Sequence, residues 1–151
     1  MYKKVLVPLD GSDLAECVLP HVEAVATGCG VGEVILLTIV EPVYYMIEDE
    51  GNVGINLIKV LEEREEKARH YLASAAKKLA DKGVQVKTAV VRGGAAVTIP
   101  QYARENGIDL IAMATHGRSG VSKWVWGSVA EKVLRSSPVP ILLVRPENCP
   151  V

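Results

Sequence analysis

The chain has little of several residue classes, and each shortage excludes a class of protein. It contains no Phe and only 5% aromatic residues, so Val, Leu, Ile and Ala must fill the interior, which is typical of a sheet buried on both faces. No apolar stretch approaches the ~20 residues that a membrane-spanning helix needs. Basic and acidic residues are nearly balanced, 17 against 18, so composition gives no electrostatic case for nucleic acid or an anionic membrane as partner.

Cysteine is also scarce, with Cys17, Cys29 and Cys149 and no close pair among them. An odd number of scattered cysteines favours reduced thiols over a disulfide framework. The first apolar run, residues 4–9, is too short for the hydrophobic region of a signal peptide. We therefore expect a cytoplasmic protein.

Apolar runs and helical stripes alternate along the whole chain. Strands are expected at residues 4–9, 33–40, 84–91, 109–114 and 138–145, and helices at 14–27, 57–82, 95–106 and 129–136. This alternation predicts one α/β domain over residues 1–151: a doubly wound, Rossmann-like open parallel sheet of five strands with helices on both faces. If the first strand is central, the strand order is 3-2-1-4-5.

Prolines and glycines define the ends of these elements. Ser12 is expected to cap the first helix, and Pro20 to bend it or to remove one of its hydrogen bonds. Residues 41–56 show no clear period and form a long loop, of which residues 46–56 are either a lid over the site or a plain disordered linker. Pro138 and Pro140 place the last strand at an edge, or else lie outside its paired stretch.

The connection between residues 114 and 128 is the candidate ligand site. Ligands of doubly wound sheets bind beyond the carboxyl ends of the strands, where the strand order reverses. For the predicted order this point lies between the first and fourth strands, which brings Asp10 beside a loop rich in glycine and serine. Backbone N–H groups at the start of the following helix favour an anion there, so the layout suits a nucleotide.

Better-known nucleotide motifs are absent. Ser122 stands where a Walker loop needs its second glycine, and the glycines between 28 and 32 follow a helix and precede a strand, unlike a dinucleotide fingerprint. His21, His70 and His116 form no metal cluster with the cysteines. No catalytic residue is assigned, because no general base is evidently placed for attack by water.

Four segments together closely resemble the universal stress protein family. They are DLIAMATHGRSG at 109–120, GSVAEKVL at 127–134, PVPILLVR at 138–145 and VLVPLDGS at 5–12. In the nucleotide-binding branch of that family a glycine motif runs Gly, two residues, Gly, nine residues, Gly-Ser/Thr. Gly117, Gly127 and Ser128 match its second and third parts, whereas Ala114 holds the first position, where its methyl group would crowd a phosphate or favour a smaller ligand.

The resemblance implies a role for each matching position. Asp10 meets the adenine or ribose end beside Pro8 and Leu9, and Ile39 packs on the adenine. Met113 and Ala114 are implied to line the turn between ribose and phosphates. The phosphates are held through main-chain amides and the hydroxyl at Gly117, Gly127, Ser128 and Val129. Arg118 and Lys123 add positive charge. The ligand is ATP, or AMP or ADP, with Mg²⁺ or Mn²⁺ arriving on a triphosphate and no metal ligand supplied by the protein. Gly127→Val is expected to remove binding and leave the fold, because its side chain would fill the space meant for phosphate.

The resemblance further implies a homodimer that pairs through the last strand and acts in ligand-dependent signalling or stress survival, with no nucleic acid or membrane partner. Three alternatives stay open: a slow ATPase, an interaction dimer without nucleotide, and a monomer whose last strand is covered. Simpler roles also stay open for single residues. Asp10 and Ser128 are each explained by helix capping, and His116 by a hydrogen bond that orients the loop.

Overall fold

The computed structural model describes residues 1–42, 53–116 and 127–146. Strands and helices alternate as the sequence predicts, except that the first helix is divided. The elements are β1 (Lys4–Pro8), α1 (Asp13–Glu16), α2 (Leu19–Cys29), β2 (Glu33–Val40), α3 (Val53–Ala80), β3 (Val86–Arg92), α4 (Ala95–Glu105), β4 (Leu110–Ala114), α5 (Ser128–Ser136) and β5 (Ile141–Val144).

The five strands form one sheet in the order β3-β2-β1-β4-β5, and every neighbouring pair is parallel. This confirms the predicted order, with β1 in the centre. All five carboxyl ends therefore lie along one edge of the sheet, and β1 and β4 meet where the order reverses.

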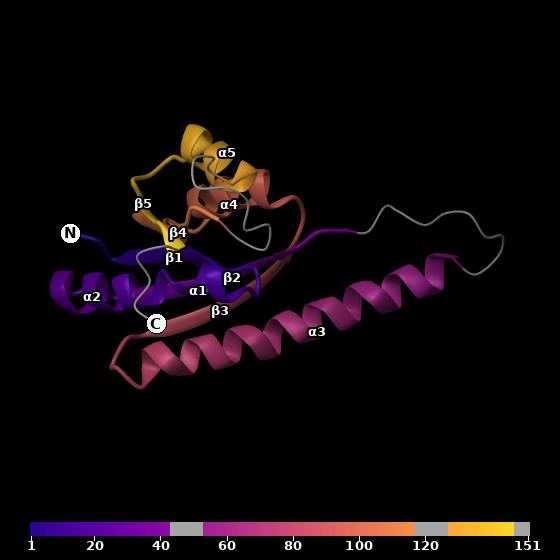
Figure 1. Ribbon diagram of the computed structural model, residues 1–151, viewed down its shortest axis with the longest axis horizontal. Coiled ribbons are helices and arrows are strands. Elements are labelled where there is room, and N and C mark those ends of the chain that lie inside the picture. Colours follow the sequence, from indigo (N-terminus) through magenta and orange to yellow (C-terminus); the bar gives the residue numbers. More distant parts are fainter. Residues whose placement is uncertain (43–52, 117–126, 147–151) are drawn as a thin grey trace.

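Two apolar clusters cover the two faces of the sheet. Alternate strand residues point to opposite faces, so Val5 and Val7 join α1, α2 and α3, whereas Leu6 lies in the cluster with α4 and α5. The side chains of Leu6, Val7 and Leu36 have no exposed surface. Figure 1 shows the two helical layers on either side of the strands.

The first helix differs from the prediction, because two short helices replace the single one expected at residues 14–27. α1 is capped by the Ser12 hydroxyl, as expected, and ends after one turn. Pro20 then lies in the first turn of α2, where its missing N–H has no partner to lose. The proline therefore begins a helix instead of bending one.

Helix α3 is longer than predicted and extends beyond the sheet. It begins at Val53 instead of residue 57 and, at 1.5 Å per residue, its 28 residues span ~42 Å. Its C-terminal half packs through Leu72 and Leu79, while Figure 1 shows its N-terminal half projecting past β3. Within the described ranges no helix, α3 included, is both long and apolar enough to cross a lipid bilayer.

At the amino edge of the sheet, Asp109 joins the two central strands. Its carboxylate accepts hydrogen bonds from the main-chain N–H groups of Lys3 at 2.8 Å and Lys4 at 2.9 Å. These two hydrogen bonds, of which the one from Lys4 has the larger effect, hold the pKa of the Asp109 carboxyl below its usual value.

Both parts of the prediction for the prolines of the last strand are confirmed. β5 is an edge strand of the sheet, and Pro138 and Pro140 precede the residues that pair with β4.

Candidate functional site

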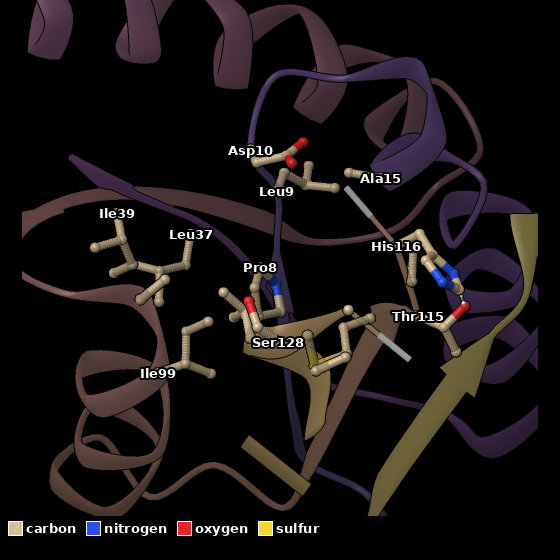
Figure 2. Close-up of a pocket in the computed structure, with 16 residues that line it drawn as sticks. Pro8, Leu9, Asp10, Ala15, Leu37, Ile39, Ile99, Thr115, His116 and Ser128 are labelled. Carbon is tan, nitrogen blue, oxygen red and sulfur yellow. Dashed lines mark hydrogen bonds between the residues drawn. The ribbon is translucent and has the colours of Figure 1, made fainter. Parts of the chain in front are cut away.

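A pocket of about 260 Å³ opens at the carboxyl edge of the sheet, between β1 and β4. This volume lies just below the usual range for small-molecule sites, which begins at roughly 300 Å³. Strand ends supply one part of its wall, and the first turns of α1, α4 and α5 supply the rest. Figure 2 shows side chains from these elements converging on one space.

Asp10 is held at the rim of this pocket by the residues that follow β1. Its carboxylate accepts hydrogen bonds from the N–H of Ser12 at 2.9 Å and from the Ser12 hydroxyl at 2.5 Å. Gly11 makes the turn between them with a φ of 87°, a conformation that favours glycine. Ser12 in turn caps α1 by accepting from the Ala15 N–H, so the cap is Ser12, and Asp10 orients it.

The end of β4 and the start of α5 are joined directly. The Gly127 N–H donates to the Thr115 carbonyl at 2.9 Å. The Thr115 hydroxyl is hydrogen-bonded to Nδ1 of His116 at 2.9 Å, which Figure 2 marks with a dashed line. The Thr115 N–H also donates to Val144 of β5 at 2.9 Å, so Thr115 links three elements at the pocket wall.

This junction gives Gly127 a different role from the expected one. A Cβ atom at Gly127 would lie 2.8 Å from the Thr115 carbonyl oxygen and 3.7 Å from the His116 Cα. Its side-chain position therefore meets main chain, and Gly127→Val would disturb the local fold as well as any ligand. The expectation that this variant leaves the fold intact is wrong on steric grounds.

The first turn of α5 offers main-chain donors to the pocket. Gly127 is the N-cap and has no side chain to satisfy them, so Ser128 is the first helical residue and not a cap. The Glu131 N–H makes the bond back to the Gly127 carbonyl, at 3.0 Å. The N–H groups of Ser128, Val129 and Ala130 precede that bond, and all three residues line the pocket. A helix start of this kind favours an anion.

The opposite end of the pocket is apolar. Leu37 and Ile39 from β2 and Ile99 from α4 lie together on the left of Figure 2, with Asp10 above them and Ser128 near the centre of the view. Among the described lining residues there is no Lys or Arg, and the titratable groups are Asp10 and His116. The pocket thus suits a ligand with an apolar, flat end and an anionic end.

Nine of the eleven site residues predicted from the sequence line this one pocket: Pro8, Leu9, Asp10, Ile39, Met113, Ala114, Gly127, Ser128 and Val129. Gly117 and Arg118, and Lys123 with them, lie outside the described residues. The structure brings the nine together, and their individual roles toward a nucleotide stay predictions.

Three residues of the apolar end, two from α4 and one from β2, are not among the site residues predicted from the sequence. Ala95 and Ile99 line the apolar end, and Leu37 faces it two residues before Ile39. The signal was available, because β3 ends at the same edge as β1 and the helix that follows it must begin beside the pocket. Alternation along β2 likewise places Leu37 and Ile39 on one face.

The described part of the chain contains no group of three His, Cys, Asp or Glu residues that fits a metal ion. Asp10 is the one carboxylate among the described lining residues, which is fewer than a protein-held divalent cation needs. The described residues therefore do not form a metal site of their own.

A scan against protein-family models matches residues 1–145 to the universal stress protein family. Among curated proteins, universal stress protein MJ0577 of Methanocaldococcus jannaschii is 35% identical over an alignment that covers 98% of each chain. Universal stress protein YxiE of Bacillus subtilis is 32% identical, over 96% of this chain and 100% of its own.

Solved structures show the same architecture. The MJ0577 structure superposes with a TM-score of 0.82 at 34% identity and 96% coverage of both chains. A universal stress family protein of Arabidopsis thaliana with AMP bound has a TM-score of 0.65 at 15% identity, over 95% of this chain and 91% of its own, and so shares the fold. With a family match over nearly its whole length, relatives above 30% identity and the same five-stranded sheet, this chain belongs to the universal stress protein family.

Proposed function

We propose that this protein binds an adenine nucleotide, with ATP as the first candidate and AMP or ADP as the smaller ones, in the pocket between β1 and β4. The observation that carries the proposal is that Ser128, Val129 and Ala130, whose main-chain N–H groups begin helix α5, line a pocket whose other end is apolar. The Arabidopsis protein with AMP bound is consistent with this ligand class, but its 15% identity carries the fold alone.

The geometry of β2 supports adenine as the base. The Glu33 N–H bonds toward β1 and the Val34 N–H toward β3, so by alternation the main-chain groups of Ile39 face the side of β1. β1 ends at Pro8 and does not reach Ile39. A neighbouring N–H donor and C=O acceptor match the ring nitrogen and amino group of adenine, whereas guanine carries a carbonyl acceptor in place of that amino group.

The remaining roles follow from position. Asp10 lies where a ribose would join the two ends, and its carboxylate accepts hydrogen bonds from hydroxyl groups. Mg²⁺ or Mn²⁺ would accompany a triphosphate and be held by phosphate oxygens, because the described residues make no metal site. Hydrogen bonds to Ser12 and Thr115 engage Asp10 and His116, so we expect binding without fast hydrolysis.

Calorimetry with Mg-ATP on the ligand-free protein tests the proposal. Ser128→Ala and Asp10→Asn should each weaken binding about tenfold or more, because each removes a hydrogen bond that involves a charged group. Matched controls are Ser136→Ala at the other end of α5 and Asp13→Asn at an exposed position of α1, which should bind like the wild type. No heat with the wild type, and no adenine nucleotide released from purified protein on denaturation, would favour the interaction dimer instead.

We also propose that two copies pair antiparallel through β5 and act as a ligand-dependent signalling dimer in the cytoplasm. The main-chain oxygens of Pro140 and Val144 bond inward to β4, so residues 141 and 143 face outward by alternation. Leu143→Pro removes an outward N–H while keeping the inward bonds. Analytical ultracentrifugation should show a dimer for the wild type and a monomer for this variant, and a wild-type monomer would reject the pairing.

A further inference from the structure

A buried hydroxyl stands out in the aliphatic strand β2. Thr38 is 8% exposed, and among the described residues Thr38 and Thr115 are the two buried polar ones. A hydroxyl taken out of water costs free energy unless it is hydrogen-bonded. The Thr38 hydroxyl is satisfied by donating to the Leu9 main-chain carbonyl at 2.9 Å.

This hydrogen bond lies where the pairing of β1 with β2 ends. The Leu9 N–H still donates to the Leu37 carbonyl at 2.8 Å, in the manner of a parallel ladder. The Leu9 carbonyl is then held by a side chain of β2. Leu9 is thus fixed at both its N–H and its C=O, one residue before Asp10.

Asp10 is consequently supported from two sides. Thr38 fixes the residue that precedes it, and Ser12, capping α1, holds its carboxylate. The peptide between these two anchors includes Gly11, whose positive φ makes the turn. Movement of the Leu9 carbonyl would therefore move Asp10, which lines the pocket, although Thr38 itself is not among the described lining residues.

We infer that Thr38 is a positioning residue of the nucleotide site: its hydroxyl, through the Leu9 carbonyl, sets where the Asp10 carboxylate lies at the rim of the pocket. This inference rests on the proposed function, because Asp10 matters in this way only if it contacts the ligand. It adds a residue outside the pocket to those that determine affinity.

Substitution by valine isolates the hydroxyl. Thr38→Val keeps the side-chain volume but leaves the buried Leu9 carbonyl without this donor, at the cost of an unmade hydrogen bond. Mg-ATP affinity should fall about fivefold to tenfold. Thr38→Ser retains the hydroxyl and should bind within about twofold of the wild type. Thr88→Val, the same change on an exposed position of neighbouring β3, should have no effect.

A double-mutant cycle with Asp10→Asn distinguishes positioning from general destabilisation. If Thr38 acts through Asp10, Thr38→Val should weaken binding less than about twofold once Asp10 is already changed. Should Thr38→Val not fold, Thr38→Ala replaces it in the same cycle. Additive losses, or a Thr38→Ser variant as weak as Thr38→Val, would overturn the inference while nucleotide binding stood. A wild type that binds no nucleotide would overturn the proposed function and this inference with it.

Discussion

Gly127→Ala tests the close approach between the end of β4 and the start of α5. The backbone of Gly127 has φ −56° and ψ 143°, which any residue adopts, so a substitution adds no dihedral strain. The obstacle is contact, because the new Cβ would lie 2.8 Å from the Thr115 carbonyl oxygen. Carbon–oxygen contacts of this kind ordinarily measure about 3.3–3.6 Å, so the two segments must separate by roughly half an ångström.

The expected loss of stability is about 1–3 kcal/mol, which is typical of forcing an extra carbon into a packed site. The same separation strains the hydrogen bond from the Gly127 N–H to the Thr115 carbonyl. Because the N–H groups of Ser128 and Val129 follow directly, nucleotide affinity should fall together with stability. Urea unfolding followed by circular dichroism, without ligand, measures the first effect, and calorimetry measures the second.

Gly94→Ala is the matched control. Gly94 is also a helix N-cap without a side-chain cap, with extended φ −86° and ψ 125°, and a Cβ there meets nothing within 4 Å. Both variants lose glycine at an N-cap and restrict the unfolded chain equally, so their difference isolates the contact with Thr115. Equal unfolding midpoints for the two alanine variants would refute this account of Gly127.

Two further predictions concern residues at opposite ends of β4. Asp109→Asn should destabilise the fold, and the difference in stability from the wild type should be largest near about pH 7 and shrink toward about pH 3. The reason is that the pKa of Asp109 is lowered in the folded protein. The stabilisation from its carboxylate is therefore complete above the ordinary Asp pKa of about 3.9 and is lost as the pH falls through the lowered value. Unfolding midpoints across that range measure it, and a difference independent of pH would contradict the reasoning. Ala114→Gly should lower the free energy of unfolding by about 0.5–1 kcal/mol, because glycine weakens a strand. Mg-ATP affinity should stay within about twofold of the wild type, because Ala114 belongs to the same buried apolar cluster as Leu9 and Ala15. A marked gain in affinity would show instead that this methyl crowds the phosphates.

The sequence was sufficient for the architecture because alternation of apolar runs and helical stripes has few topological solutions. It was weaker at boundaries. A bend at Pro20 within one helix is the wrong prediction, since the one-turn helix α1 is too short to show a period of its own. The predicted start of α3, at residue 57, is four residues late because Gly54 and Asn56 have low helix propensity.

The candidate site was predictable where a residue lies in one of the connections that follow β1 and β4, next to the reversal point. Asp10, Gly127 and Ser128 were found in this way, and all three line the pocket. Thr38 was not found, because its part depends on a hydrogen bond to Leu9, 29 positions away in the chain, that no local pattern reveals. Close main-chain approach, as at Gly127, is likewise a property of three dimensions.

The central position of β1 affects how the chain can assemble during synthesis. Its partner β2 begins at Glu33, whereas its other partner β4 begins only at Leu110. A nascent chain can therefore complete the β3-β2-β1 half of the sheet while β1 still presents an unpaired and strongly apolar border. Folding intermediates aggregate through unpaired apolar edge strands of this kind, so a chaperone would be needed most while the sheet is only partly formed.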